Sequence, residues 1–120
     1  MYFWCIMLHY ELEAKQLREL MKKSDIAISA AGSTLYELAM CGTPTIAIIT
    51  ADNQKLIAGE MENKGIVIKL DATDANISEK IHNTVQTLIK NKLLRSKMTE
   101  YSHIFRDYKT TLQFESEFII

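Results

Sequence analysis

Short apolar runs alternate with amphipathic stretches along most of this chain. The runs are typical of strands buried on both faces of a parallel sheet, and they cover residues 2–9, 26–29, 45–49 and 66–70. The amphipathic stretches repeat apolar residues every three or four positions, which predicts helices over 13–23, 33–41, 53–64, 77–90 and 92–108. Strands that alternate with helices predict an α/β fold: a Rossmann-like parallel sheet of about four strands with helices on both faces.

The helix-ending residues around Gly42 support this assignment of helices and strands. Gly42 follows the predicted helix over 33–41, in the position where a helix commonly ends in a left-handed residue. Pro44 then prevents the helix from continuing. We therefore expect a sharp helix end and a fresh strand over 45–49.

The two ends of the chain are the least regular parts of the pattern. We expect one domain over residues 1–109 and a C-terminal tail over 110–120, whose mixed composition fits an edge strand, a docked tail or a frayed end. The apolar start, residues 1–8, lacks the basic region and cleavage site of a signal peptide and is too short to span a bilayer. Because a domain seldom begins inside its own core, we expect a partial chain.

Composition narrows the class of protein only slightly. With 14 basic and 15 acidic residues, the net charge of -1 gives no electrostatic reason to expect nucleic acid or an anionic membrane as a partner. Cys5 and Cys41 have no metal-ligand spacing and sit among apolar residues. We expect two buried free thiols in a cytoplasmic protein, with a disulfide or a reactive thiol as the alternatives.

The most informative stretch is residues 29–39, which joins a strand end, a turn of small residues and a helix start. The first N–H groups of a helix have no partner within it and carry partial positive charge, so this order predicts an anion site. Gly32 lets the chain pass close to a ligand, and Ser33 and Thr34 either cap the helix or donate to a phosphate. Glu37 lies one turn further on, within reach of sugar hydroxyls, so we expect a diphosphate that carries a sugar.

Each of these residues also has a purely structural interpretation. The turn over 31–34 is also compatible with an ordinary capped strand-to-helix turn, and Glu37 with a solvated helix residue. Asn53 and Gln54 have the chemistry of a turn and a helix cap as well as that of a sugar contact. For Asp52 we favour a turn or cap over a catalytic role.

The sequence offers no catalytic machinery that we can assign. It shows no nucleophile paired with a base and no metal-ligand cluster. The three histidines, His9, His82 and His103, fall at a strand end and on predicted helices. We therefore name no catalytic residue, no metal and no cofactor.

Residues 24–54, SDIAISAAGSTLYELAMCGTPTIAIITADNQ, resemble the C-terminal, nucleotide-sugar-binding domain of GT-B type proteins. The likeness is closest to the UDP-sugar hydrolases of pseudaminic acid biosynthesis and their spore-coat polysaccharide relatives. Glycosyltransferase family 28, with its murein N-acetylglucosaminyltransferases, is more distant. The resemblance extends over about residues 9–90. It implies that the chain is a partial GT-B C-terminal domain.

The resemblance also implies a role for individual residues. It assigns diphosphate binding, through backbone N–H groups and hydroxyls, to four residues of the turn: Ala31, Gly32, Ser33 and Thr34. Glu37 takes the place of the acid that accepts hydrogen bonds from the ribose, and Asn53 and Gln54 that of the polar pair that meets the sugar. Residues 12–14 fall where such proteins hold uracil.

Several family features are missing from the sequence. The N-terminal domain, which supplies the catalytic histidine of the hydrolases, is absent, as is the glycine-rich turn that opens the C-terminal domain. We therefore expect a UDP-sugar-binding domain of a bacterial hydrolase or glycosyltransferase in surface-polysaccharide synthesis that is inactive by itself.

Two other interpretations stay open. One is a non-catalytic module that forms a homo-oligomer or docks on a separate N-terminal domain chain. The other is a flavodoxin-like or receiver-like domain. A receiver needs acidic residues clustered at an early strand end, which this chain lacks.

Overall fold

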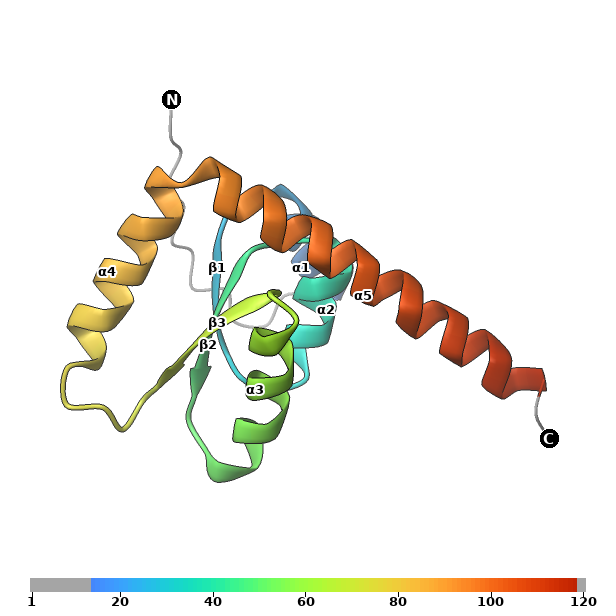
Figure 1. The fold of residues 1–120 in the computed structure, drawn as a ribbon, viewed down its shortest axis with the longest axis horizontal. Coiled ribbons are helices and arrows are strands. Elements are labelled where there is room, and N and C mark those ends of the chain that lie inside the picture. Colours follow the sequence, from blue (N-terminus) through green and yellow to red (C-terminus); the bar gives the residue numbers. More distant parts are fainter. Residues whose placement is uncertain (1–13, 119–120) are drawn as a thin grey trace.

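The computed structural model describes the backbone over residues 14–118 and the side chains over 15–107. Helices and strands alternate in it, with one short 3-10 helix, η1 (Figure 1). In chain order the elements are α1 (Ala14–Lys23), β1 (Ala27–Ala30), α2 (Thr34–Cys41), β2 (Thr45–Ile49), η1 (Asp52–Gln54), α3 (Lys55–Asn63), β3 (Val67–Asp71), α4 (Ile77–Lys90) and α5 (Lys92–Phe118).

The strands form one parallel sheet in the order β1-β2-β3. Ile48 of β2 is the register partner of both Ala30 in β1 and Leu70 in β3. The expectation of an α/β fold with a parallel sheet is confirmed, but the described residues form three strands and not about four. The strand expected over residues 2–9 lies outside the described part of the chain.

Helices cover both faces of the sheet, as expected. Alternate residues of a strand point to opposite faces, so β2 contributes Ala47 and Ile49 to one core and Ile46 to the other. The first core lies under α2, α3 and α5 and comprises Ala31, Leu35, Ala39, Ala47, Ile49, Ala58, Met61, Ile66, Val67 and Phe105. The second lies under α4 and the start of α5 and is built on Ile46, Leu88 and Met98.

Helix α5 packs along the edge at which β2 and β3 begin (Figure 1). The residues before these strands, Gly42 and Gly65, have positive φ of 72° and 76°. The ring of Tyr101 lies against Gly65, and the side chains of Thr99 and His103 lie against Gly42. Because α5 occupies this edge, the opposite edge, where the strands end, is left to the loops.

The C-terminal part of α5 corrects the sequence prediction. The helix was expected to end near residue 108 and to be followed by a tail, but it continues to Phe118 and extends past the other elements in Figure 1. The prediction ended the helix where the apolar repeat fades, after residue 108. The helix continues because residues 92–118 contain no glycine or proline that would stop it. The boundary between 109 and 110 falls within this helix, and the division into domain and tail stays a prediction.

Within the part of the chain that the structure describes, no helix is both long and apolar enough to cross a membrane.

Candidate functional site

Three loops meet where the central strand β2 ends. The N–H of Ala31, after β1, donates to the carbonyl oxygen of Ile48 at 2.8 Å. The N–H of Ala72, after β3, donates to the carbonyl oxygen of Ile49 at 2.9 Å. The loop after β2 begins at the next residue, Thr50. This is the edge at which open parallel sheets bind their ligands, and it carries the turn over 31–34 and the pair Asn53 and Gln54.

The turn after β1 is held by its own backbone. The N–H of Gly32 donates to Ala30 at 2.8 Å, and the carbonyl oxygens of Gly32 and Ser33 accept from Leu35 and Tyr36 at 3.1 Å each. Ser33 has helical angles, φ -60° and ψ -25°, and its side chain makes no capping hydrogen bond. The sequence analysis considered two roles for the Ser33 hydroxyl, capping the helix and donating to a phosphate. The structure shows no capping hydrogen bond, so the hydroxyl is not used as a cap.

The turn leaves open space in front of Gly32. A Cβ atom built on Gly32 would meet nothing within 4 Å, and Gly32 is not among the glycines with positive φ. The fold therefore does not require glycine here. In the described residues, the N–H groups of Ser33 and Thr34 donate to no backbone oxygen, as is usual at a helix start. Ala31, by contrast, is fully buried and belongs to the core.

Glu37 is exposed in the first turn of α2 and forms no ion pair within the described part of the chain. It lines a pocket of about 310 Å³ between α1 and α2. The other residues of this pocket are Arg18, Met21, Lys22, Met40 and Cys41. Glu37 thus shares a groove with two cations of α1. The sequence analysis missed this relationship. The only signal for it was the i, i+4 spacing of Arg18 and Lys22, which places both on one side of a helix.

Cys41 is a free thiol, as expected, but it is only partly buried. Burial raises its pKa, against the opposite effect of the nearby Lys22 and Arg18 cations. A raised pKa keeps the group protonated near neutral pH and makes it a poor nucleophile. Cys5 lies outside the described residues.

The polar pair after β2 divides into two different roles. The Gln54 Oε1 accepts from the N–H of Thr50 at 2.8 Å and from its hydroxyl at 2.9 Å, so this side chain closes its own loop. Asn53 is exposed. Asp52 Oδ1 lies 3.1 Å from the Nζ of Lys55, and both side chains are largely in solvent. Asp52 begins the short 3-10 helix η1, which fits the turn role favoured for it over a catalytic one.

The loop after β3 brings further polar residues to this edge, which the sequence analysis did not single out. Asp71 Oδ1 accepts from the N–H of Thr73 at 2.9 Å and from its hydroxyl at 2.7 Å. These hydrogen bonds, followed by the Lys55 and Lys80 cations, hold the pKa of Asp71 below its usual value. Asp74 pairs with Lys80 at 2.6 Å. The signal in the sequence was an Asp-x-Thr directly after a strand, which is typical of such turns.

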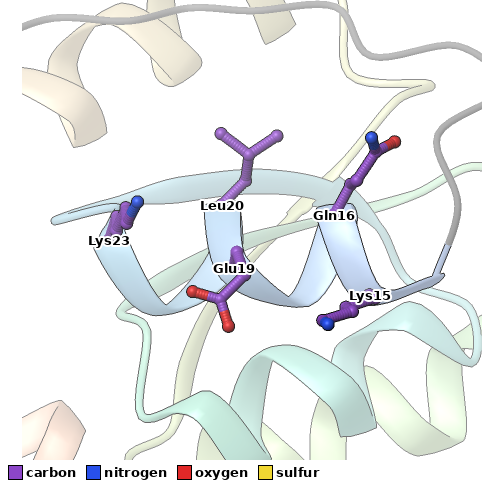
Figure 2. A pocket seen from close by; sticks show the side chains of 5 residues that line it. All are labelled: Lys15, Gln16, Glu19, Leu20 and Lys23. Atoms are coloured by element: carbon purple, nitrogen blue, oxygen red, sulfur yellow. The ribbon is translucent and has the colours of Figure 1, made fainter.

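A hollow on α1 and the histidines of α4 and α5 do not belong to the carboxyl edge described above. A hollow of about 400 Å³ is lined, among the described residues, by side chains of α1 alone: Lys15, Gln16, Glu19, Leu20 and Lys23 (Figure 2). It includes none of the predicted binding residues. His103 lies beside Gly42 at the opposite edge of the sheet, and His82 is exposed on α4. His9, Leu12 and Glu13 lie outside the described residues.

A known protein family and a named protein are similar to this chain. The family model of the glycosyltransferase family 28 C-terminal domain matches residues 10–112, a range that includes every predicted binding residue. A Helicobacter pylori (strain ATCC 700392 / 26695) protein is 45% identical over 60 residues, and its name is "Pseudaminic acid cytidylyltransferase and UDP-2,4-diacetamido-2,4,6-trideoxy-beta-L-altropyranose hydrolase". The alignment covers 48% of this chain and only 12% of that protein. No solved structure matches the chain.

Proposed function

The chain belongs to the family of glycosyltransferase family 28 C-terminal domains, and from this premise we propose that it is the UDP-sugar-binding domain of a nucleotide-sugar hydrolase or glycosyltransferase. We place that enzyme in bacterial, cytoplasmic synthesis of surface polysaccharide. The observation that carries the proposal is the turn over 31–34, where an uncapped helix start faces open space at the carboxyl edge of the sheet.

The named relative favours the hydrolase over the transferase. Its name includes the hydrolysis of a UDP-sugar. The chain spans 12% of that protein, so the activity of the whole is carried over only as part of this proposal.

In the proposed complex, the diphosphate lies against Gly32, where a side chain would otherwise stand. The N–H groups and hydroxyls of Ser33 and Thr34 donate to its oxygens, with the partial positive charge of the α2 start behind them. Glu37 accepts hydrogen bonds from the ribose hydroxyls. Ala31 contributes backbone alone, because its side chain is buried in the core.

The sugar lies toward the loop after β2 in this proposal. Asn53 is exposed there and offers a complete amide. Gln54 offers only its NH₂ group, because its Oε1 is held by Thr50. We therefore expect Asn53 to contribute more to sugar binding than Gln54, and loss of Gln54 to act mainly through the loop.

The contribution of this domain to the reaction is electrostatic. In a hydrolase, water attacks the sugar carbon, the bond from that carbon to the diphosphate oxygen breaks, and UDP leaves with the negative charge. Fixed N–H donors at the α2 start would stabilise that charge as it develops. The acid–base groups would come from another domain, so we expect the chain alone to bind UDP weakly and to have no activity.

A titration of labelled protein with UDP, followed through the amide signals, tests the proposal. We expect UDP to shift the signals of Gly32, Ser33, Thr34 and Glu37, and ADP to shift them less. The Glu37→Ala variant should lose this response, whereas Glu100→Ala, which removes an exposed acid from α5 at the other edge of the sheet, should keep it. No shift in the turn at several millimolar UDP would count against a nucleotide-binding role for this chain.

A second function is favoured by the outer edge of the sheet. Within the described residues, β1 pairs only with β2, and Ile28 of β1 is 47% exposed. A strand edge that no other part of the chain covers is a template for pairing with another chain. The alternative is therefore a binding module that forms a homo-oligomer or docks on a separate chain. A molecular mass that rises with protein concentration would support it, and a monomer at all concentrations would oppose it.

A further inference from the structure

We propose that Lys55 is a further ligand-binding residue of this site, which exchanges its ion pair with Asp52 for one with the sugar-bearing phosphate of the bound diphosphate. The inference rests on the proposed function and adds to it a residue that neither the sequence analysis nor the family resemblance assigned.

The carboxyl edge of the sheet has little positive charge to offer a diphosphate. Three acids lie at the ends of β2 and β3 or in the loops after them: Asp52, Asp71 and Asp74. Lys55 pairs with Asp52, and Lys80 pairs with Asp74. The edge therefore has no surplus of positive charge. A diphosphate adds about two further negative charges, while a helix start offers only about half a positive charge. A cation at this edge that leaves a weak ion pair for the ligand would therefore stabilise the bound state.

Among the described cations near this edge, Lys55 is the one held by a weak, solvated ion pair. Lys80 is engaged by Asp74 at 2.6 Å, with both side chains about half exposed. Lys15 lines the separate hollow on α1 (Figure 2). Arg18 and Lys22 share the groove of Glu37, the residue assigned to the ribose, and so lie toward the nucleoside and not toward the sugar. Lys55 lies 3.1 Å from Asp52, but the exposed fractions of the two side chains are 60% and 97%. Such a solvated pair contributes little, so Lys55 can leave it at small cost.

The place of Lys55 at the start of α3 favours a role toward the ligand. It is the first residue of α3, where a cation opposes the helix dipole and does not serve the stability of the helix. Its positive charge is felt by Asp71 at the end of β3, where it contributes to lowering the pKa of that carboxyl group. Lys55 directly follows η1 in the loop after β2, so it lies at the carboxyl edge of the sheet that carries the predicted site.

The position of Lys55 in the chain favours one of the two phosphates of UDP. Lys55 directly follows Asn53 and Gln54, the pair expected at the sugar, whereas the turn over 31–34 lies on the other side of the β2 end. The phosphate that bears the sugar stands between these two groups. A cation on the sugar side would thus meet the β-phosphate of UDP and not the α-phosphate that UMP shares with it.

The experiment compares UDP and UMP binding in charge variants of Lys55. Lys55→Met keeps the aliphatic stem and removes the charge, and we expect it to weaken UDP binding about tenfold with little effect on UMP, because a hydrogen bond between charged groups is lost. Lys55→Arg should restore most of the UDP affinity. Asp52→Asn, which removes the resting partner, should tighten UDP binding.

The matched control is Lys80→Met, which removes the paired cation from the same edge and should leave both affinities unchanged. If the unaltered chain binds UDP and Lys55→Met binds it equally well, the role of Lys55 is refuted while the proposed function stands. Equal weakening of UDP and UMP would refute a contact with the β-phosphate. If the unaltered chain binds neither nucleotide, both the role of Lys55 and the proposed function fail.

Discussion

The hydroxyl of Thr99 donates a hydrogen bond of 2.7 Å to the carbonyl oxygen of Gly42, 57 positions earlier in the chain. This bond joins the first half of α5 to the residue that ends α2. The N–H of Gly42 in turn donates to Ala39 at the end of α2. The long C-terminal helix is thereby fixed to the same helix whose first turn forms the candidate site.

Gly42 is therefore expected to be intolerant of a side chain. Its φ is 72°, and a Cβ atom there would lie 2.7 Å from the Nε2 of His103 and 3.2 Å from Thr99. The left-handed backbone and the close contact together should make Gly42→Ala destabilising by about 2 kcal/mol or more. Urea denaturation should show a lower midpoint.

The control for this prediction is Gly59→Ala. Gly59 lies inside α3, and an added Cβ would have only the Nζ of Lys69 near it, at 3.9 Å. Because alanine is the better helix former, this variant should be more stable by about 0.5–1 kcal/mol. Equal midpoints for the two variants would contradict the strain assigned to Gly42.

Gly32 should behave differently from both. An added Cβ meets no atom of the protein within 4 Å, so we expect Gly32→Ala to change the free energy of unfolding by less than about 0.5 kcal/mol. Under the proposed function the methyl group fills the space meant for the diphosphate, and UDP binding should be greatly weakened. Urea midpoints and UDP titrations of the same variant measure the two effects separately. A stable variant that binds UDP normally would remove Gly32 from the site.

Local patterns predicted the elements around the site well. The expected strand over 45–49 coincides with β2, and the stop at Gly42 and Pro44 is confirmed by a left-handed residue directly after α2. Both depend on near neighbours in the chain: an apolar run for the strand, and a glycine followed by a proline for the helix end.

What the sequence analysis missed depends on contacts between elements. The role proposed for Lys55 was not predicted, because nothing in its neighbourhood in the sequence tells a solvated lysine from one that faces a site. The groove that Glu37 shares with Arg18 and Lys22 requires the packing of α1 beside α2. The helix through residues 109–118 was missed because apolar spacing was weighed above the absence of a helix breaker.

Two buried hydroxyl groups should respond to removal in opposite ways. The Oγ of Ser102 in α5 is fully buried and finds no hydrogen-bond partner within the described part of the chain. The buried hydroxyl of Thr43 donates to the carbonyl oxygen of Met21 and so joins α1 to the start of β2. Ser102→Ala should be neutral or stabilising, whereas Thr43→Val should cost about 1–2 kcal/mol. Thermal unfolding of the two variants checks this, and a large loss in Ser102→Ala would reveal a partner for that hydroxyl.

The last prediction concerns Asp71 and pH. Two hydrogen bonds from Thr73 favour its charged form, with help from Lys55 and Lys80, and the pKa is lowered from 3.8. Since the folded pKa lies below the unfolded value, the group contributes stability that is present above about pH 4 and is lost as the pH falls through the folded pKa. In Asp71→Asn, the acid limb of a plot of the urea midpoint against pH should therefore be flatter.

Substitutions can show whether hydrogen bonds or nearby cations lower the pKa of Asp71. Thr73→Val removes the hydroxyl donor but keeps the N–H donor, so the pKa of Asp71, followed through its carboxyl carbon signal, should rise part of the way back toward 3.8. Lys55→Met should raise it by less, because the cation is the smaller cause. A larger rise in Lys55→Met than in Thr73→Val would show that charge, not hydrogen bonding, dominates this edge of the sheet.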